Sequence, residues 1–230
     1  MKVCEHLKMI HDRIRKTAVA CGRDPETIKL IAVSKRQDIE KIRAMHACGQ
    51  KTFAENYIQE AQEKIKHGQL DEARWHFIGH LQSNKTATAV ELFDLIQTVD
   101  RAKVAKKIQL HAARLGKRQK ILVQVNVGRE KQKSGVLPED AAALLESIVQ
   151  EPNIEILGLM TMPPWSKDPE ASRTYFRQLR ELARDLADKK LFNHQEQVEL
   201  SMGMSGDYQI AIEEGATMVR IGTALFGARP

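Results

Sequence analysis

The 230-residue chain has few of the residues that mark several specialised protein classes. Its three cysteines, Cys4, Cys21 and Cys48, are odd in number and show no Cys-x-x-Cys spacing, which argues against a disulfide framework and a zinc ribbon. We therefore expect no metal site and a reducing, cytoplasmic location. The charged N-terminal segment lacks the apolar stretch of a signal peptide, and no apolar run approaches the roughly 20 residues that span a bilayer. We expect no association with a membrane.

Aromatic residues are also scarce, at 5% of the chain, while 36 basic and 30 acidic residues give a net charge of +6. Nucleic-acid binders more often combine clustered basic residues with aromatic side chains that stack on bases. The most basic segment, residues 101–120, carries a helical apolar stripe formed by Val104, Ile108, Ala112 and Leu115. Its lysines are therefore predicted to form the solvated face of an amphipathic helix, and we expect no nucleic-acid partner.

The hydrophobic pattern predicts a long helix over residues 3–21, followed by about eight alternations of a short apolar strand with an amphipathic helix. Such alternation indicates parallel strands covered by helices, which an open doubly wound sheet and a closed (β/α)₈ barrel both satisfy. The count of about eight favours a single α/β TIM barrel with an added N-terminal helix. No flexible linker or composition break divides the sequence, so we predict one domain over residues 1–230.

The boundaries of these elements follow from apolar runs, glycine stops and proline starts. The predicted strands cover residues 28–33, 52–54, 75–78, 95–99, 121–127, 154–160, 198–202 and 218–221. The predicted helices between them cover residues 38–48, 57–66, 85–91, 101–115, 138–149, 169–190 and 207–214. In such a barrel the chemistry lies at the carboxyl ends of the strands, so residues there are the candidates for a functional site.

Lys35 directly follows the first predicted strand. The mouth of the barrel would partly desolvate its ammonium group, which favours the neutral amine that forms a Schiff base with a carbonyl compound. The ordinary alternative is a lysine whose stem covers apolar surface while its charge reaches solvent. Position alone favours that alternative.

Small residues follow the last two predicted strands, in Ser201–Ser205 and in Gly222-Thr223. Loops at these two strand ends form the recurrent phosphate site of the barrel, because backbone N–H groups and hydroxyls can approach the anion there. The alternative is a pair of tight turns with no ligand. The pattern leaves both interpretations open.

Arg220 lies inside the last predicted strand, where alternation directs it away from the face of Val219 and Ile221. If that other face is the barrel interior, the guanidinium group needs a partner. A barrel carboxylate, Glu55 or Glu199, would be the structural partner, and a bound ring nitrogen or anion would be the functional one. The sequence does not decide between them.

His76 and His80 are four residues apart, a spacing that would put both on one face of an extended segment. A metal site would need further ligands, and the sequence offers no obvious ones. We therefore interpret His76 as a core histidine and His80 as a loop residue.

Five motifs in this order resemble the pyridoxal phosphate homeostasis proteins. They are IAVSK (31–35), FAENYIQEAQEK (53–64), WHFIGHLQSNK (75–85), GLMTMPP (158–164) and LSMGMSGDYQIAIEEGATMVRIGTALFGAR (200–229). Members of that family are similar to the N-terminal barrel domain of alanine racemase, the fold type III of pyridoxal phosphate (PLP) proteins. The motifs extend over almost the whole chain, so the resemblance is specific.

This resemblance implies PLP as the cofactor and a set of residues that contact it. On that basis Lys35 would form the Schiff base, Arg220 would face the pyridine nitrogen, and Asn56 would lie beside the cofactor. The phosphate would be held by Ser201, Gly222 and Thr223, with help from the backbone N–H of Met202. His80 would lie in a loop at the same mouth, with no defined role. Gly206 stands where the family often has an acidic residue, outside the implied contacts.

The resemblance also implies a protein that holds PLP reversibly, protects its aldehyde and supplies it to apoenzymes, without efficient catalysis and with no catalytic residues. An arginine at the ring nitrogen disfavours pyridine protonation and so weakens the electron sink that racemisation needs. The chain ends soon after the eighth predicted strand, so we expect it to lack the C-terminal domain that gives alanine racemases a tyrosine base and a dimer interface. We therefore expect a monomer. The alternatives are a PLP-dependent amino-acid racemase or decarboxylase, and a Schiff-base lyase without PLP.

Overall fold

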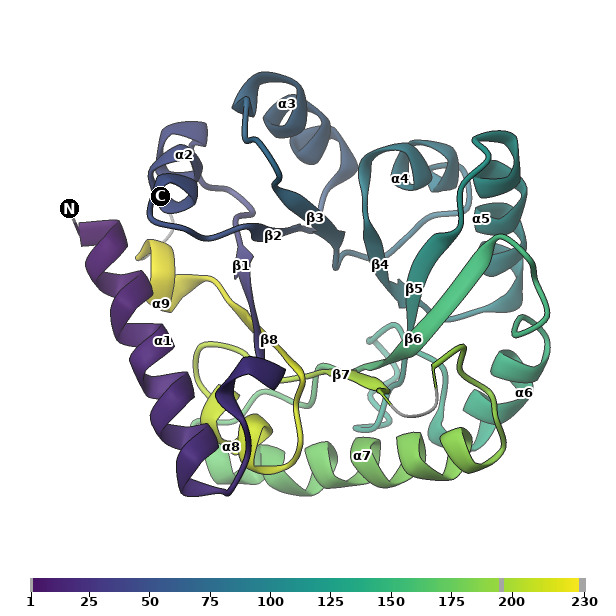
Figure 1. Cartoon of the computed structure of the whole chain (residues 1–230). Coiled ribbons are helices and arrows are strands. Elements are labelled where there is room, and N and C mark those ends of the chain that lie inside the picture. The colour runs from purple at the N-terminus through teal and green to yellow at the C-terminus, as the bar shows by residue number, and fades with distance from the viewer. Residues whose placement is uncertain (1, 195–196, 228–230) are drawn as a thin grey trace.

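The computed structural model describes residues 2–194 and 197–227. Eight parallel strands close into a barrel in the order β1 to β8, with β8 paired to β1 (Figure 1). The strands are β1 (Lys29–Val33), β2 (Thr52–Glu55), β3 (Arg74–Phe77), β4 (Leu95–Val99), β5 (Gln119–Gln124), β6 (Ile154–Met160), β7 (Glu199–Ser201) and β8 (Met218–Ile221). The predicted closed barrel is confirmed, and the open sheet is excluded.

Helices surround the barrel on the outside (Figure 1). They are α1 (Lys2–Ala20), α2 (Ile39–Ala47), α3 (Ile58–Gly68), α4 (Thr86–Leu92), α5 (Ala102–Arg114), α6 (Ala141–Glu146), α7 (Arg173–Asp188), α8 (Tyr208–Glu213) and α9 (Thr223–Phe226). Three 3₁₀ turns, η1 (Pro25–Thr27), η2 (Pro138–Asp140) and η3 (Pro169–Ser172), each begin with a proline. Proline suits a first helical position, because the N–H it lacks has no partner there.

The main differences from the predicted elements lie at their ends. β5 ends at Gln124 rather than at Val127, because the next residues turn toward the following loop and the Asn126 N–H donates to Val136 O at 2.8 Å. The predicted helices at 138–149 and 169–190 begin as the 3₁₀ turns η2 and η3. The short helix α9 after β8 is missing from the prediction, because four residues show no helical periodicity.

The core has two layers. The inner layer fills the barrel with the side chains of Ile31, Val33, Ala54, Ile78, Leu95, Leu122, Met160 and Met218. The outer layer lies between the strands and the helices and includes the predicted apolar stripe of α1, from Leu7 to Ala18. α1 packs against α8, α9 and α2 and so covers one side of the barrel (Figure 1). The part of the predicted stripe that lies in α5 is buried, whereas Leu115, directly after this helix, is 49% exposed.

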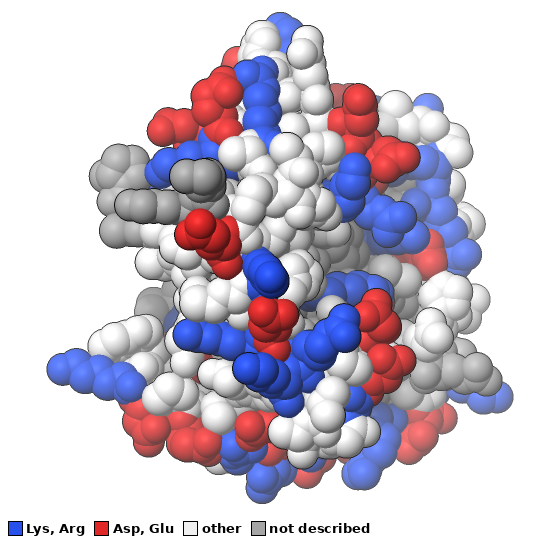
Figure 2. Space-filling view, turned by 60° about the vertical axis from the view of Figure 1, so that its left-hand side comes forward, with Lys and Arg blue, Asp and Glu red and all other residues white. Residues whose placement is uncertain are grey.

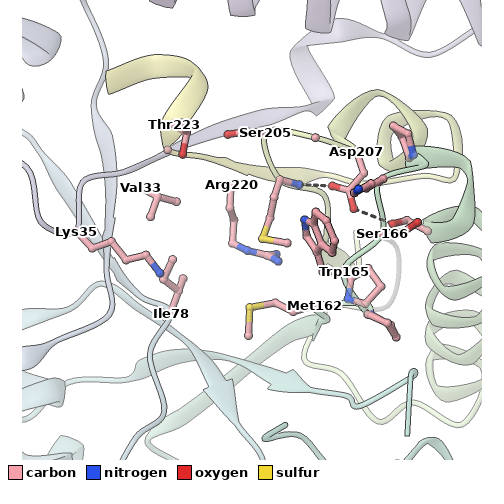
Figure 3. A pocket seen from close by; sticks show the side chains of 18 of the residues that line it. Val33, Lys35, Ile78, Met162, Trp165, Ser166, Ser205, Asp207, Arg220 and Thr223 are labelled. Carbon is pink, nitrogen blue, oxygen red and sulfur yellow. Dashed lines mark hydrogen bonds between the residues drawn. The ribbon is translucent and has the colours of Figure 1, made fainter. Parts of the chain in front are cut away.

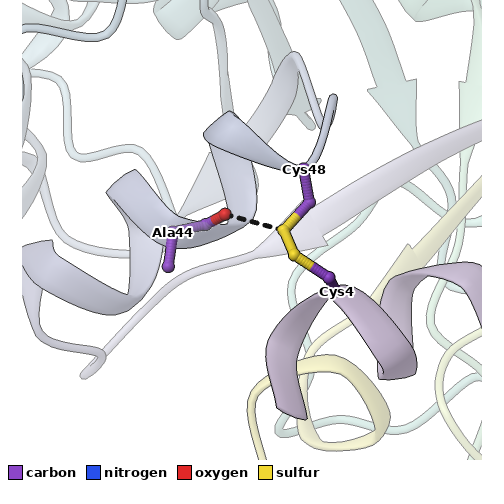
Figure 4. Close-up of a disulfide and its surroundings, with 3 residues drawn as sticks. All are labelled: Cys4, Ala44 and Cys48. Carbon is purple, nitrogen blue, oxygen red and sulfur yellow. Dashed lines mark hydrogen bonds between the residues drawn. A yellow bond between two sulfur atoms is a disulfide. The ribbon is translucent and has the colours of Figure 1, made fainter. Parts of the chain in front are cut away.

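A disulfide joins Cys4 in α1 to Cys48 at the C-terminal end of α2 (Figure 4), with the two Cα atoms 5.5 Å apart. The odd number of cysteines, which argued against a disulfide framework, therefore does not exclude this single disulfide. The fold brings together two residues that are 44 positions apart, which spacing in the sequence does not reveal. Cys21 is the exposed free thiol. Cysteine usage accordingly does not support the predicted cytoplasmic location, which stays a prediction.

The surface carries charges of both signs, as the sequence indicates. Figure 2 shows Lys and Arg side chains interspersed with Asp and Glu side chains over one face. Within residues 2–194 and 197–227, no helix combines the length and the apolar character needed to cross a bilayer.

Candidate functional site

A cavity of about 320 Å³ opens at the carboxyl ends of the strands (Figure 3). Its wall includes the loops after β1, β2, β6, β7 and β8. Five of the seven residues predicted to contact a cofactor line it: Lys35, Asn56, Arg220, Gly222 and Thr223. These residues come from three separate parts of the chain, and only closure of the barrel brings them together.

The other two predicted residues, Ser201 and Met202, lie outside the cavity lining. The Ser201 hydroxyl is buried and donates to Gln97 Oε1 at 2.6 Å. The side chain of Met202 packs in the outer core, and its backbone N–H donates to Met218 O at 3.1 Å. Neither residue therefore presents a donor to the cavity. Ser205, at the far end of the same segment, lines the cavity instead.

The reason for this shift is the backbone at Gly203, which has a φ of 89°. A Cβ atom there would lie 2.5 Å from the Ala211 Cβ, so the close turn also requires glycine on steric grounds. Beyond this residue, Met204 and Ser205 line the cavity. The glycine between two methionines was the sequence signal for a turn here, but the spacing of residues along the chain does not predict the direction of that turn.

Lys35 is partly buried at a tight turn that follows β1. The Ser34 N–H donates to Ala54 O at 3.0 Å, and the Gln37 N–H donates to Ser34 O at 3.0 Å. Arg36, next in the chain, has a φ of 57°, in the left-handed region that side chains disfavour. Figure 3 shows the Lys35 side chain extended along the cavity toward Ile78.

Arg220 projects into the barrel interior beneath the cavity, which is the placement that requires a partner for its guanidinium group. Its guanidinium group donates to Ser201 Oγ at 2.7 Å and to Thr161 O at 2.8 Å. Burial lowers the pKa of Arg220 to about 10, so it remains a cation at neutral pH; the nearby Asp207 charge acts in the opposite direction.

Neither carboxylate considered as a structural partner of Arg220 bonds it. Glu55 bonds Lys64 and Ser34, and Glu199 pairs with Lys29 and Thr217. Burial raises the pKa of Glu55 despite its neighbour Lys64. The hydrogen bonds of Arg220 within the described residues thus go to neutral oxygen atoms.

A neutral relay, the hydrogen-bonded chain of Ser201, Gln97 and His76, supports Arg220 inside the barrel. Gln97 accepts from Ser201 through Oε1 and lies 2.9 Å from His76 Nδ1 through Nε2. Because an amide nitrogen only donates, Nδ1 accepts and the His76 proton lies on Nε2. Burial, aided by the charges of Lys29 and Arg74, lowers the pKa of His76 to about 3, so this histidine is neutral.

His76 is thus a core histidine, as predicted. His80 is exposed, and its Nδ1 lies 2.9 Å from Ser134 Oγ. It is not among the residues that line the cavity, and its role stays undefined. No cluster of metal-ligating side chains occurs among the residues that the structure describes.

The cavity wall offers amine, amide, guanidinium and hydroxyl groups to a ligand. The Asn56 Oδ1 atom is buried and lacks a hydrogen-bond partner within the described chain, which indicates a group that a ligand completes. Gly79 allows the Asn56 backbone to approach, because a Cβ there would lie 2.0 Å from Asn56 O. On the opposite wall the Ala224 N–H donates to Ser205 Oγ at 3.4 Å, which joins the loop after β7 to the start of α9 beside Thr223.

Comparison with known proteins agrees with this arrangement. Residues 6–230 match the family model of the alanine racemase N-terminal domain. The chain is 43% identical to the pyridoxal phosphate homeostasis protein of Aquifex aeolicus over 100% of this chain and 99% of that protein. It is 44% identical to the protein of the same name from Pseudomonas aeruginosa, over 99% and 96% of the two chains.

Solved structures give the same result. The chain superposes on PipY of Synechococcus elongatus, a structure with PLP bound, with a TM-score of 0.85 and 35% identity over 98% of this chain and all of that one. Alanine racemase of Corynebacterium glutamicum shares the fold, with a TM-score of 0.70 and 19% identity over 97% of this chain and 62% of that one. The sequence, the barrel and the cavity together show that this chain belongs to the pyridoxal phosphate homeostasis protein family, whose barrel is that of the alanine racemase N-terminal domain.

Proposed function

We propose that this protein binds pyridoxal 5'-phosphate in the cavity as a Schiff base on Lys35, holds it reversibly in PLP homeostasis, and supplies it to the apo forms of PLP-dependent enzymes. The observation that carries the proposal is the convergence of an amine, an unsatisfied amide oxygen and a buried guanidinium group on one cavity, in Lys35, Asn56 and Arg220. PLP supplies an aldehyde that an amine attacks, with formation of a C=N bond and release of one water.

Each residue of the site has a proposed part. The Lys35 amine binds the aldehyde carbon, and the side-chain amide of Asn56 forms a hydrogen bond to the ligand beside it. Arg220 faces the ring nitrogen as a donor and disfavours its protonation. Ser205, Gly222 and Thr223 hold the phosphate through hydroxyl and backbone N–H groups. Ser201 orients Arg220 rather than the phosphate.

The site supports binding better than turnover. Racemisation needs a second base on the face opposite the lysine. The titratable side chains in the described cavity lining are Lys35, Lys167, Asp207 and Arg220. Asp207 already accepts from the Met204 N–H at 2.7 Å and from the Ser172 hydroxyl at 2.9 Å. We propose a single-domain, monomeric, cytoplasmic carrier without efficient catalysis.

The test combines three measurements on the purified full chain. Borohydride reduction in the presence of PLP should fix the cofactor to Lys35, with no adduct in Lys35→Ala. Incubation of the PLP-loaded protein with an apoenzyme should restore the activity of that enzyme. Amino acids should show no sustained turnover. Steady turnover that depends on Lys35 would instead favour a racemase or decarboxylase, and absence of an adduct would refute the binding site.

A further inference from the structure

A buried ionic cluster lies directly behind the Lys35 turn. Lys64 of α3 is 7% exposed, and Glu55 of β2 is completely buried. The Lys64 Nζ atom lies 2.8 Å from Glu55 Oε1, 2.6 Å from Glu60 Oε1 and 2.7 Å from Ser34 O. An ammonium group has three N–H donors, so these three acceptors saturate it.

The cluster binds the chain on both sides of Lys35. Ser34, which precedes it, accepts a hydrogen bond from Lys64 through its carbonyl oxygen and donates its hydroxyl to Glu55 Oε1 at 2.6 Å. Arg36, which follows it, donates its backbone N–H to Glu60. Because Arg36 has a left-handed φ of 57°, the turn is unfavourable in isolation and needs such contacts to persist.

We propose that Lys64 is a positioning residue, which acts with Glu55 and Glu60 to fix the turn at Ser34–Arg36 so that the Lys35 amine meets the aldehyde of a bound ligand. The inference rests on the proposed function and deepens it. Lys64 does not react itself, since its three donors are already engaged. Of Lys35 and Lys64, only Lys35 lines the cavity.

General energetics supports a geometric role over a purely stabilising one. Buried ion pairs are often no more stabilising than well-packed apolar side chains, because desolvation offsets their attraction. Such a cluster does, however, fix backbone groups in one geometry with directional, charge-assisted hydrogen bonds. A small displacement of a reacting group is costly for a covalent step and nearly neutral for a phosphate contact on the opposite wall.

The experiment therefore separates covalent from non-covalent binding. PLP reports both, whereas pyridoxine 5'-phosphate has the same ring and phosphate with an alcohol in place of the aldehyde. In Lys64→Met we expect the borohydride-fixed fraction on Lys35 at saturating PLP to fall roughly tenfold. The affinity for pyridoxine 5'-phosphate should stay within about twofold of the parent value, because the phosphate loops are untouched.

Two further variants keep the test decisive if Lys64→Met does not fold. Glu60→Ala removes the acceptor of the Arg36 N–H at a partly exposed position and should give the same selective loss. Glu60→Gln keeps an acceptor and should restore most of the fixed fraction. The matched control is Lys29→Met, which breaks the ion pair with Glu199 at the opposite end of β1 and should change neither readout.

The outcomes distinguish this proposal from the function on which it rests. Lys64→Met and Glu60→Ala with full fixation on Lys35, or with equal losses for both ligands, would overturn the positioning role. An adduct mapped to Lys64 would also overturn it. No fixation in the parent protein would refute the proposed function itself.

Discussion

The two walls of the cavity are supported by opposite kinds of chemistry. Behind Lys35 the support is ionic, and Lys64 with two glutamates binds the backbone of the residues on either side. Beneath Arg220 the support is neutral: a serine hydroxyl and a backbone carbonyl accept from the side chain itself, and a glutamine accepts from that serine. The difference matches the two tasks: a reacting amine needs a fixed backbone, whereas a buried cation that keeps its charge for a ligand must not be neutralised by a carboxylate.

The largest effect on ligand affinity should follow removal of the buried cation. In Arg220→Met we expect affinity for PLP and for pyridoxine 5'-phosphate to fall about 10- to 100-fold, because a charged hydrogen bond contributes about 1.5–3 kcal/mol. At saturating PLP the fraction fixed on Lys35 should stay close to the parent value. Titration with both ligands followed by borohydride fixation measures the two quantities. Loss of fixation at saturation would show that the two walls are not separable.

A smaller effect should follow a break in the neutral relay. Gln97→Leu removes the acceptor of the Ser201 hydroxyl and so releases the orientation of Arg220. One neutral hydrogen bond contributes about 1 kcal/mol, so we expect about a fivefold loss of affinity for both ligands. Calorimetric titration of the variant would detect this loss. An unchanged affinity would mean that Thr161 O alone orients the guanidinium group.

The neutral relay should also make stability depend on pH. The fold lowers the pKa of His76 from an ordinary 6.5 to about 3. Between pH 6.5 and pH 3, His76 is therefore protonated in the unfolded chain and neutral in the folded one. The free energy of unfolding should therefore fall as pH falls from about 6.5 toward 3, by up to about 1.4 kcal/mol per pH unit. Urea denaturation from pH 7 to pH 4 measures the slope, which His76→Gln should reduce. An equal slope in that variant would assign the dependence to other groups.

The smallest effect on ligand binding is expected outside both walls, at the Cys4–Cys48 disulfide. It closes a loop of 44 residues, so its reduction should lower the free energy of unfolding by up to about 4 kcal/mol. PLP affinity should not change, since neither cysteine lines the cavity. Denaturation with and without reductant measures the stability, and Cys21→Ser is the control that should keep the response. A loss of PLP on reduction would link α1 to the site.

The sequence predicted the barrel because its signal is repeated. A pattern of eight apolar runs that alternate with amphipathic helices tolerates an error at any one boundary, such as the early end of β5 at Gln124. The places of Lys35, after the first strand, and of Arg220, within the last one, could also be predicted from the strand pattern. Their roles could not, and only the resemblance to the family indicated them.

The features that the sequence did not reveal depend on how separate helices, strands and loops pack against one another. Ser205 lines the cavity in place of Ser201 because of the turn at Gly203, and tertiary packing sets the conformation of that turn. Glu60 and Lys64 read as an ordinary i,i+4 surface pair on a helix, and only the approach of α3 to the Lys35 turn buries them. The Cys4–Cys48 contact likewise requires α1 to lie against α2.

A crystal structure of the protein soaked with PLP would test the central claim most directly. We predict electron density continuous from the Lys35 amine to the former aldehyde carbon, the phosphate beside Ser205 and Thr223, and the ring nitrogen facing Arg220. A ligand that leaves Lys35 unmodified at full occupancy, or whose phosphate lies away from those two hydroxyls, would contradict the account.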